Sequence, residues 1–364
     1  MIACIVGTTA ELIKIAPVFH EFRARGRDIE IWYSGQHVQE LGPALADLDL
    51  PAPALWLVPE SGARNLARPS EVPRWFARYA RTVVTRRRSL RRRLERGGHP
   101  WVLVHGDTFT APLGAVTGRL LGARVGHVEA GMRSGSLLHP FPEELNRRVA
   151  AHLVDVHFAP SPTEARNLRH RRGAIVMTGA NTVVDAVRHA LTRSARPPLD
   201  LPETYGVATL HRFELVSRED LYREALETLR DASARLPIVY FAGASERERI
   251  AQYGLGHLFD DERFRIEDKL SYVDFMPVLS RAEFVVTDSG GLQEESQHLG
   301  IPAAIHRNKT ERHGGEGRQM VLTRFDRGRL QAFLDDYERY RSEPTIDAHH
   351  PSKVIADAID AIDA

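Results

Sequence analysis

Short apolar runs alternate with amphipathic stretches along almost the whole sequence, and this alternation limits the folds that the chain can adopt. In the first half, the apolar runs are candidate strands at Ile2–Gly7, Ile29–Ser34, Trp101–Gly106, Arg124–Glu129, Val154–Ala159 and Ala174–Gly179. A second series of candidate strands follows at Gly206–His211, Pro237–Gly243, Phe264–Asp268, Glu283–Asp288 and Pro302–His306. Strands that are apolar on both faces and alternate with helices indicate parallel sheets covered on both sides.

Helical patterns occupy the intervening segments, for example Ala10–Arg25, Ala111–Leu121, Arg218–Ala234 and Arg329–Tyr340. A chain of 364 residues is about right for two such domains. We therefore predict an α/β protein of two Rossmann-like, doubly wound domains facing a central cleft. The boundary is placed where TGANTVVDAV begins a new helix, so that residues 1–178 form the first domain and residues 179–345 the second.

The composition argues against several classes of protein. Lys and Arg number 49 against 48 Asp and Glu, and the resulting net charge of +1 argues against a nucleic-acid-coating protein. The single cysteine, Cys4, leaves no internal disulfide or multi-cysteine metal site and favours a cytoplasmic location. No basic targeting region precedes the first strand, and no apolar stretch approaches the length of a membrane span. We expect no nucleic-acid partner and no membrane insertion.

The segment Arg86–Arg96, RRRSLRRRLER, is strongly basic. It could contact an anionic partner or a membrane surface, or it could be a solvated helix face whose charge is balanced elsewhere. The near-neutral net charge of the chain favours the solvated face.

Polar clusters follow several of the candidate strands. Lys14 lies about one turn into the helix after the first strand, and HGDT, GHVEAGMRSG and LHRFE end later strands. Each residue has a structural alternative: Asp107 could cap a helix, Glu129 could bond to backbone, and His211 could be a core histidine. Because neighbouring parallel strands are only about 5 Å apart, we expect these side chains to converge. Carboxyl groups with His and Lys or Arg nearby suit proton transfer on an anionic ligand.

The stretch TDSGGLQEES joins a candidate strand to a helix through two glycines. The turn at Gly290 and Gly291 exposes backbone N–H groups at a helix N-terminus, which suits a phosphate. A glutamate in this first turn complements the helix dipole but repels a phosphate. At least one of Glu294 and Glu295 is therefore expected to point elsewhere, toward a sugar hydroxyl.

Six motifs occur in the order and approximate spacing of one known family: VHGDT, GHVEAGMRSG, PFPEELNRR, GANTVVDAV, TDSGGLQEES and TER. The chain resembles the non-hydrolysing UDP-N-acetylglucosamine 2-epimerases over nearly its whole length. This resemblance implies a GT-B-type fold, usually a homodimer, in which residues 346–364 form a C-terminal helix that returns to the first domain. The implied substrate is a UDP-sugar, and the reaction uses no redox cofactor and no metal.

In the reaction that the resemblance implies, UDP-N-acetylglucosamine loses UDP by elimination across C1–C2 and gives 2-acetamidoglucal. UDP then adds back after C2 is protonated from the other face, which gives UDP-N-acetylmannosamine. The implied catalytic residues are Asp107, Glu129, Glu143 and His211. The first three handle protons, and the histidine helps to neutralise the departing diphosphate. The implied substrate-binding residues are Lys14, Arg133, Arg212, Ser289, Gly290, Gly291, Glu295 and Arg312. Among them, the serine and glycines form the diphosphate seat, and the glutamate binds the ribose.

The sequence departs from the family pattern at three places. Thr9 stands where an arginine is expected, Phe213 replaces the second arginine after the histidine, and His313–Gly317 alters a nucleotide-facing loop. A family histidine that belongs to an allosteric substrate site is also missing near Gly243–Ser245. These departures leave open a related GT-B enzyme that acts on a different nucleotide sugar, either a hydrolysing 2-epimerase or a glycosyltransferase. A non-catalytic nucleotide-sugar binding protein is a third alternative, against which the retained carboxylates argue.

Overall fold

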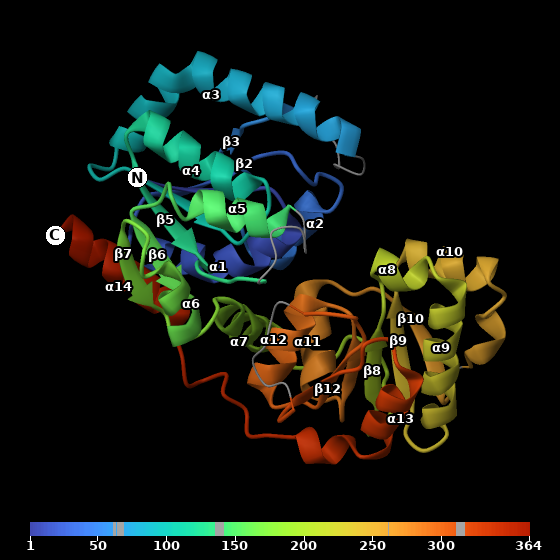
Figure 1. Ribbon diagram of the computed structural model, residues 1–364. Coiled ribbons are helices and arrows are strands. Elements are labelled where there is room, and N and C mark those ends of the chain that lie inside the picture. The colour runs from blue at the N-terminus through green and yellow to red at the C-terminus, as the bar shows by residue number, and fades with distance from the viewer. Residues whose placement is uncertain (61–62, 64–68, 135–141, 261, 311–316) are drawn as a thin grey trace. The chain divides into compact units, whose positions relative to one another are not determined.

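The computed structural model describes residues 1–60, 63, 69–134, 142–260, 262–310 and 317–364 (Figure 1). They form two compact units, one of Met1–Ala186 with His349–Ala364 and the other of Val187–Ala348. Each unit contains one parallel sheet, and this confirms the prediction of two Rossmann-like α/β domains. The division between the units falls within α7 (Val183–Arg193), the helix that follows the predicted boundary.

The first unit is built on a seven-stranded parallel sheet in the order β3-β2-β1-β4-β5-β6-β7. Its strands are β1 (Ile2–Val6), β2 (Ile29–Tyr33), β3 (Leu55–Trp56), β4 (Trp101–His105), β5 (Arg124–Val128), β6 (Val156–Ala159) and β7 (Ala174–Met177). The chain winds outward in one direction from β1 to β3 and then in the other from β4 to β7. The order therefore reverses between β1 and β4. In open parallel sheets the loops after two such strands diverge, and ligands bind in the crevice between these loops.

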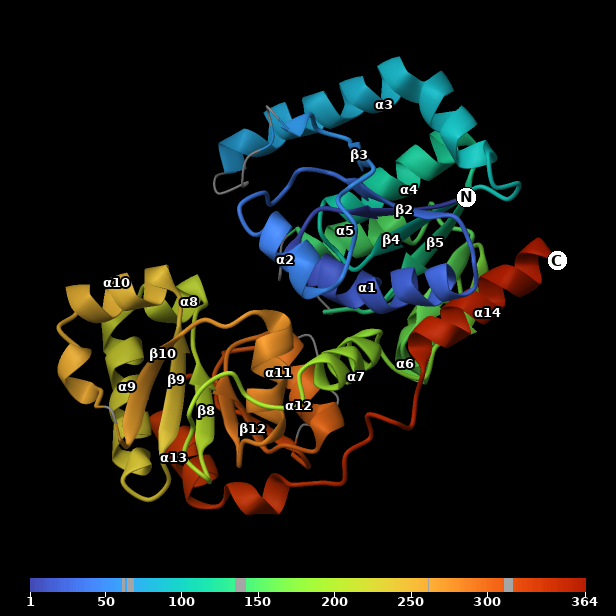
Figure 2. The same ribbon diagram turned by 180° about the vertical axis from the view of Figure 1, so that it is seen from behind.

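Helices cover both faces of this sheet, with α3 and α4 on one face and α1 with α14 on the other (Figures 1 and 2). The helices are α1 (Thr9–Ala24), α2 (Leu41–Asp47), α3 (Val72–Glu95, after the 3-10 turn Pro69–Glu71), α4 (Thr110–Leu121), α5 (Glu143–Ala150), α6 (Pro162–Leu168) and α14 (Pro351–Asp363). The large side chains Trp75 and Tyr79 of α3 pack with Ile5 and Val104 of the central strands. This apolar packing fixes α3 against the sheet.

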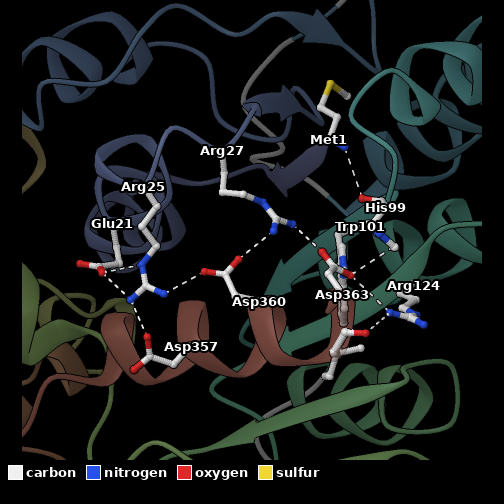
Figure 3. A network of polar contacts seen from close by, with 11 residues as sticks. Met1, Glu21, Arg25, Arg27, His99, Trp101, Arg124, Asp357, Asp360 and Asp363 are labelled. Atoms are coloured by element: carbon white, nitrogen blue, oxygen red, sulfur yellow. Dashed lines mark hydrogen bonds and ion pairs between the residues drawn. The ribbon is translucent and has the colours of Figure 1, made fainter.

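The last helix, α14, is held to the first unit by a network of ion pairs (Figure 3). Asp360 accepts hydrogen bonds from Arg25 at 2.9 Å and from Arg27 at 2.7 Å. One turn further, Asp363 accepts from Arg27 at 2.5 Å and from the indole nitrogen of Trp101 at 2.9 Å. A segment more than three hundred residues from α1 in the sequence thus completes the same unit.

The second unit is built on a six-stranded parallel sheet in the order β10-β9-β8-β11-β12-β13. Its strands are β8 (Gly206–Thr209), β9 (Ile238–Ala242), β10 (Phe264–Asp268), β11 (Val285–Thr287), β12 (Ala303–Ile305) and β13 (Met320–Leu322). Its helices after α7 are α8 (Phe213–Val216), α9 (Glu219–Ser233), α10 (Ala244–Gln252), α11 (Tyr272–Ser280), α12 (Gly290–Leu299) and α13 (Arg327–Asp335), with 3-10 turns at Gly256–Leu258 and Tyr337–Tyr340. The strand order reverses between β8 and β11, as it does between β1 and β4.

Two features of the fold differ from the sequence prediction. The strands β3 and β13 were not predicted: β3 has only two residues, and β13 has three residues that are not part of a longer apolar run. The single helix expected over Arg329–Tyr340 is wrong: α13 ends at Asp335, because Asp336 leaves the helical region with φ −146° and ψ 46°. Within the described ranges, no helix is long and apolar enough to cross a membrane.

Candidate active site

Polar residues gather where the central strands of each sheet end. In the first unit, Gly7 follows β1, His105 ends β4 and Glu129 follows β5. These three strands are neighbours, since β4 pairs with β1 on one side and with β5 on the other. In the second unit, His211 lies beyond β8 and Asp288 follows β11, its neighbour. Both groups therefore occupy the position at which the strand order reverses, where open parallel sheets bind ligands.

Glu129 is buried between a lysine and a histidine. Its Oε2 atom lies 2.5 Å from Nζ of Lys14 and 3.0 Å from Nε2 of His105. The ammonium compensates a carboxylate that would be costly to bury alone. The backbone of Glu129 has a φ of +64°, a left-handed conformation that is costly for a residue with a Cβ. The fold thus holds this carboxylate in one place at the end of β5.

The start of α1 sets the position of Lys14. Thr8 and Glu11 form a capping box: the Glu11 backbone N–H donates to Thr8 Oγ1 at 3.3 Å, and Glu11 Oε2 accepts from the Thr8 backbone N–H at 3.0 Å. The other carboxylate oxygen of Glu11 accepts from Thr108 Oγ1 at 2.7 Å, which ties the helix start to the loop after β4. Burial raises the pKa of Glu11, an effect that the hydrogen bonds from Thr108 and the Gly7 backbone partly offset.

Asp107 is held by the helix α5. Its carboxylate pairs with the guanidinium of Arg147, and its backbone oxygen accepts from Nδ2 of Asn146 at 2.9 Å. Arg147 is also 3.6 Å from Oε2 of Glu144, one turn earlier on the same helix. Glu144 is completely buried and accepts a hydrogen bond from Nε of Arg148 at 2.8 Å. The arginines of α5 therefore neutralise both carboxylates, and Asp107 is fixed relative to this helix.

Glu143 and Arg133 each present a buried polar atom to the same region. Oε2 of Glu143, at the first position of α5, has no hydrogen-bond partner among the described residues. Arg133 donates to the backbone oxygen of Met132 at 2.6 Å, but its Nη2 atom is buried without a hydrogen-bond partner in the same described part of the chain. Burial lowers the pKa of Arg133, and the Glu144 carboxylate opposes this shift. Buried polar atoms of this kind need a partner, which a ligand can supply.

In the second unit, Asp288 organises the loop that carries His211. Its Oδ2 atom accepts from the backbone N–H groups of His211 and Arg212, both at 2.8 Å, and Oδ1 lies 3.1 Å from Nδ1 of His211. Burial raises the pKa of the Asp288 carboxyl, while the nearby His211 and Arg212 act in the opposite direction. The contact at Nδ1 orients the half-exposed imidazole so that Nε2 is the atom available to a ligand.

The first turn of α12 lies next to this loop, and its backbone is arranged as in the anion-binding sites at helix N-termini. Ser289 caps the helix by accepting from the backbone N–H of Leu292 at 3.4 Å. A Cβ added at Gly291 would come within 4 Å of Ser289 Oγ and Glu295 Oε1, at 3.7 and 3.9 Å. The buried carboxylate of Glu295 therefore points back toward the first turn, which begins at Gly290. The backbone N–H groups there suit an anion.

The remaining sequence-based candidates fall outside these clusters. Arg312 lies outside the described residues, as does most of the altered loop after it. The substituted Phe213 begins α8 and is 76% exposed, so its ring is available for contact with a ligand. Thr9 begins α1. No group of three or more His, Cys, Asp or Glu side chains in the described part of the chain is arranged to hold a metal ion.

Sequence reasoning missed several residues that build the site. Glu11 could have been found from the capping-box spacing of Thr8 and Glu11, and Arg147 from its i,i+3 spacing to Glu144. His105 lies in the HGDT motif and Asp288 in TDSGG, at positions where the sequence pattern indicates only the end of a strand. Tyr240 had no signal: its hydroxyl donates to the backbone oxygen of Leu210 at 2.9 Å, just before His211.

Comparison with known proteins gives a consistent set of relatives. Residues 79–343 match the family model described as UDP-N-acetylglucosamine 2-epimerase. The chain is 32% identical over 329 residues to a probable UDP-N-acetylglucosamine 2-epimerase of Ralstonia nicotianae, covering 85% of this chain and 82% of the relative. It is 34% identical over 222 residues to the UDP-N-acetylglucosamine 2-epimerase of Bacillus subtilis, which spans 59% of this chain and 57% of that protein. The solved structure of S. aureus MnaA with UDP has a TM-score of 0.78 at 25% identity, over 99% of this chain and 96% of that one.

Proposed function

Because the chain belongs to the UDP-N-acetylglucosamine 2-epimerase family, a family of isomerases, we propose that it interconverts UDP-N-acetylglucosamine and UDP-N-acetylmannosamine. In the proposed reaction, the C2 proton is removed and the C1–O bond to UDP breaks, which leaves 2-acetamidoglucal and UDP. Protonation at C2 from the opposite face and re-formation of the C1–O bond then give the epimer. The reaction is balanced without any external oxidant or reductant.

The observation that carries this proposal is the buried Glu129 with its partners Lys14 and His105, at the reversal point of the first sheet. Epimerisation at C2 needs one group to take a proton from one face of the sugar and another to deliver a proton to the other face. Glu129, Asp107 and Glu143 come from three separate places, the ends of β5 and β4 and the start of α5. We assign the two proton transfers to this set of carboxylates.

The departing UDP carries negative charge, which must be neutralised as the C1–O bond breaks. We assign this task to His211, which Asp288 orients, and to the N-terminal turn of α12 formed by Ser289, Gly290 and Gly291. Glu295 is assigned to the uncharged ribose hydroxyls. The proposed cationic contacts to the substrate are Lys14, Arg133, Arg212 and Arg312.

Deuterium exchange tests the reaction directly. We incubate the protein with UDP-N-acetylglucosamine in deuterated water and follow the sugar by NMR. The proposal predicts deuterium at C2 and the appearance of UDP-N-acetylmannosamine. Free sugar together with released UDP would instead identify a hydrolysing relative, and turnover only with an added acceptor would identify a glycosyltransferase. Tight binding without any turnover would leave a binding protein.

Single substitutions test the assignment of the carboxylates. Asp107→Asn, Glu129→Gln and Glu143→Gln are each expected to lower kcat by about 10²- to 10⁴-fold, the usual contribution of a general acid or base. Glu262→Gln, at an exposed glutamate of the second unit, is the matched control and is expected to leave kcat unchanged. UDP binding, measured by calorimetry, is expected to persist in all four variants. Full activity in the three acid variants would contradict the proposed proton transfers.

A homodimer in the cytoplasm completes the proposal. The family resemblance supports the dimer, and the single buried cysteine is compatible with a reducing compartment. Sedimentation equilibrium at several protein concentrations measures the dimer directly, and a single species of 40.9 kDa would contradict it.

A further inference from the structure

The helix α3 divides into an apolar inner face and a strongly basic outer face. Its inner face is buried in the core of the first unit through Trp75, Tyr79, Val83, Leu90 and Leu94. Between Arg74 and Arg96 the sequence has ten arginines and one acidic residue, Glu95. This charge is concentrated on one helix of a chain whose net charge is only +1.

The outer face carries a row of arginines. Exposed arginines at helical spacings of three, four or seven residues share this face: Arg74, Arg78, Arg81, Arg88 and Arg92. We call these five residues the arginine row. Val84, which is 67% exposed, lies beside the row between Arg81 and Arg88. The helix has 24 residues and is therefore about 36 Å long, and it runs along one side of the unit (Figures 1 and 2).

Among the described residues, most of these arginines are not paired with a carboxylate. Arg93 pairs with Glu30 at 2.7 Å, Arg91 pairs with Glu95 at 2.8 Å, and Arg87 donates to a backbone oxygen at 2.9 Å. The guanidinium groups of six others make no hydrogen bond or ion pair with any described residue: Arg74, Arg81, Arg86, Arg88, Arg92 and Arg96. This arrangement agrees with a solvated helix face whose charge is balanced elsewhere, and it also leaves these arginines accessible to an anionic partner.

We propose that the arginine row binds the surface of an anionic lipid membrane. A straight row of cations on the outside of a unit can contact a flat negative surface along its whole length, and each basic residue near such a surface adds to the attraction. The exposed Val84 adds apolar contact area beside the row. Because the inner face of α3 is already used by the core, the helix adheres by charge and does not insert.

Nucleic acid is the less favoured anionic partner. The net charge of +1 gives the chain no general attraction to a polyanion, and the arginine row contains no aromatic side chain on which bases could stack. The membrane proposal does not depend on the proposed reaction, since vesicle binding is measured without any nucleotide sugar.

Vesicle co-sedimentation tests the proposal. The full chain is mixed with vesicles of phosphatidylcholine alone or of phosphatidylcholine with phosphatidylglycerol. We expect binding to the phosphatidylglycerol vesicles alone, and weaker binding as salt is added. The variant with Arg81→Gln, Arg88→Gln and Arg92→Gln is expected to bind roughly a hundredfold more weakly, from about fivefold for each arginine.

The control variant changes the same amount of charge elsewhere, with Arg169→Gln, Arg263→Gln and Arg329→Gln at exposed sites outside α3. It is expected to bind phosphatidylglycerol vesicles as the unchanged chain does. Circular dichroism checks that both variants are folded. Absence of binding by the unchanged chain, or an equal loss in the control variant, would overturn the proposal. A second result would also overturn the membrane proposal: duplex DNA displaces the chain from the vesicles, and the same three α3 substitutions abolish binding to that DNA.

Discussion

Two aspartates of α14 make it possible to measure how much burial strengthens an ion pair in this protein. Asp357 and Asp363 lie on the same helix, and each contacts an arginine of the first unit (Figure 3). The Asp357 side chain is 57% exposed and pairs with Arg25 at 2.7 Å. The Asp363 side chain is only 4% exposed, pairs with Arg27 at 2.5 Å and accepts from the Trp101 indole at 2.9 Å.

These environments predict very different effects of substitution by alanine. Asp363→Ala removes a hydrogen bond to a charged acceptor, worth about 1.5–3 kcal/mol, and leaves the indole N–H of the fully buried Trp101 without this acceptor. Removing a negative charge from a helix C-terminus is favourable and offsets this loss of stability by about 0.5 kcal/mol. With the partly buried pair to Arg27, the expected net loss is about 2–3 kcal/mol. Asp357→Ala removes an exposed pair and is expected to cost less than about 1 kcal/mol.

Native-state hydrogen exchange of peptides from α14, followed by mass spectrometry, reports the free energy of local opening. Asp363→Ala is expected to accelerate exchange in α14 by roughly a hundredfold, and Asp357→Ala by less than about fivefold. Asp363→Asn keeps an acceptor for Trp101 and is expected to fall between them. If Asp357→Ala and Asp363→Ala accelerate exchange equally, burial does not determine the strength of these contacts and the reasoning fails.

Three further predictions concern the interior of each unit. Burial lowers the pKa of His306 to about 4, so below its ordinary value of 6.5 the unfolded chain binds a proton that the native state does not. The free energy of unfolding of the second unit should therefore fall by roughly 2 kcal/mol between about pH 7 and about pH 5. In His306→Gln this free energy, measured by urea unfolding at each pH, should depend less on pH. Lys14→Met leaves the buried Glu129 carboxylate without its cation and should cost about 3–5 kcal/mol in thermal unfolding. Adding Glu129→Gln to this variant should restore its stability but not the incorporation of deuterium at C2 of the sugar. If the double variant is as unstable as Lys14→Met, the two residues do not form a buried charge pair. Asp288→Asn should lower kcat about 10- to 100-fold, and adding His211→Gln should lower it little further, because the two residues act as a unit; fully additive losses would contradict that pairing.

The central strands could be predicted from the sequence because each is apolar on both faces, a pattern produced by burial under helices. The edge strand β3 has two residues and pairs with β2 alone among the described strands, so it shows no such pattern. Alternation of strands and helices also says nothing about strand order. The contact between Lys14 and Glu129, 115 residues apart, depends on β1, β4 and β5 being neighbours, which only the structure establishes.

Residue types at strand ends indicated where the site lies but not how its charges pair. Asp107 and Glu129 were both selected as carboxylates of one cluster, yet the structure gives the first an arginine of α5 and the second a lysine of α1. These partners depend on how each helix packs on the sheet, and neither composition nor spacing encodes that orientation. The capping box of Thr8 and Glu11 is local and was visible in the sequence, because its spacing alone determines its hydrogen bonds.

The first unit draws on both early and late parts of the chain, and this has a consequence for biogenesis. Domains generally fold in the order in which the ribosome releases them. Here the sheet of the first unit can assemble early, but the side of α1 that receives α14 stays open until residues 349–364 have been synthesised. Throughout that interval Arg25 and Arg27 lack their aspartate partners. A translation product interrupted in its final turns would therefore be a substrate for chaperones and proteases, even with its second unit complete.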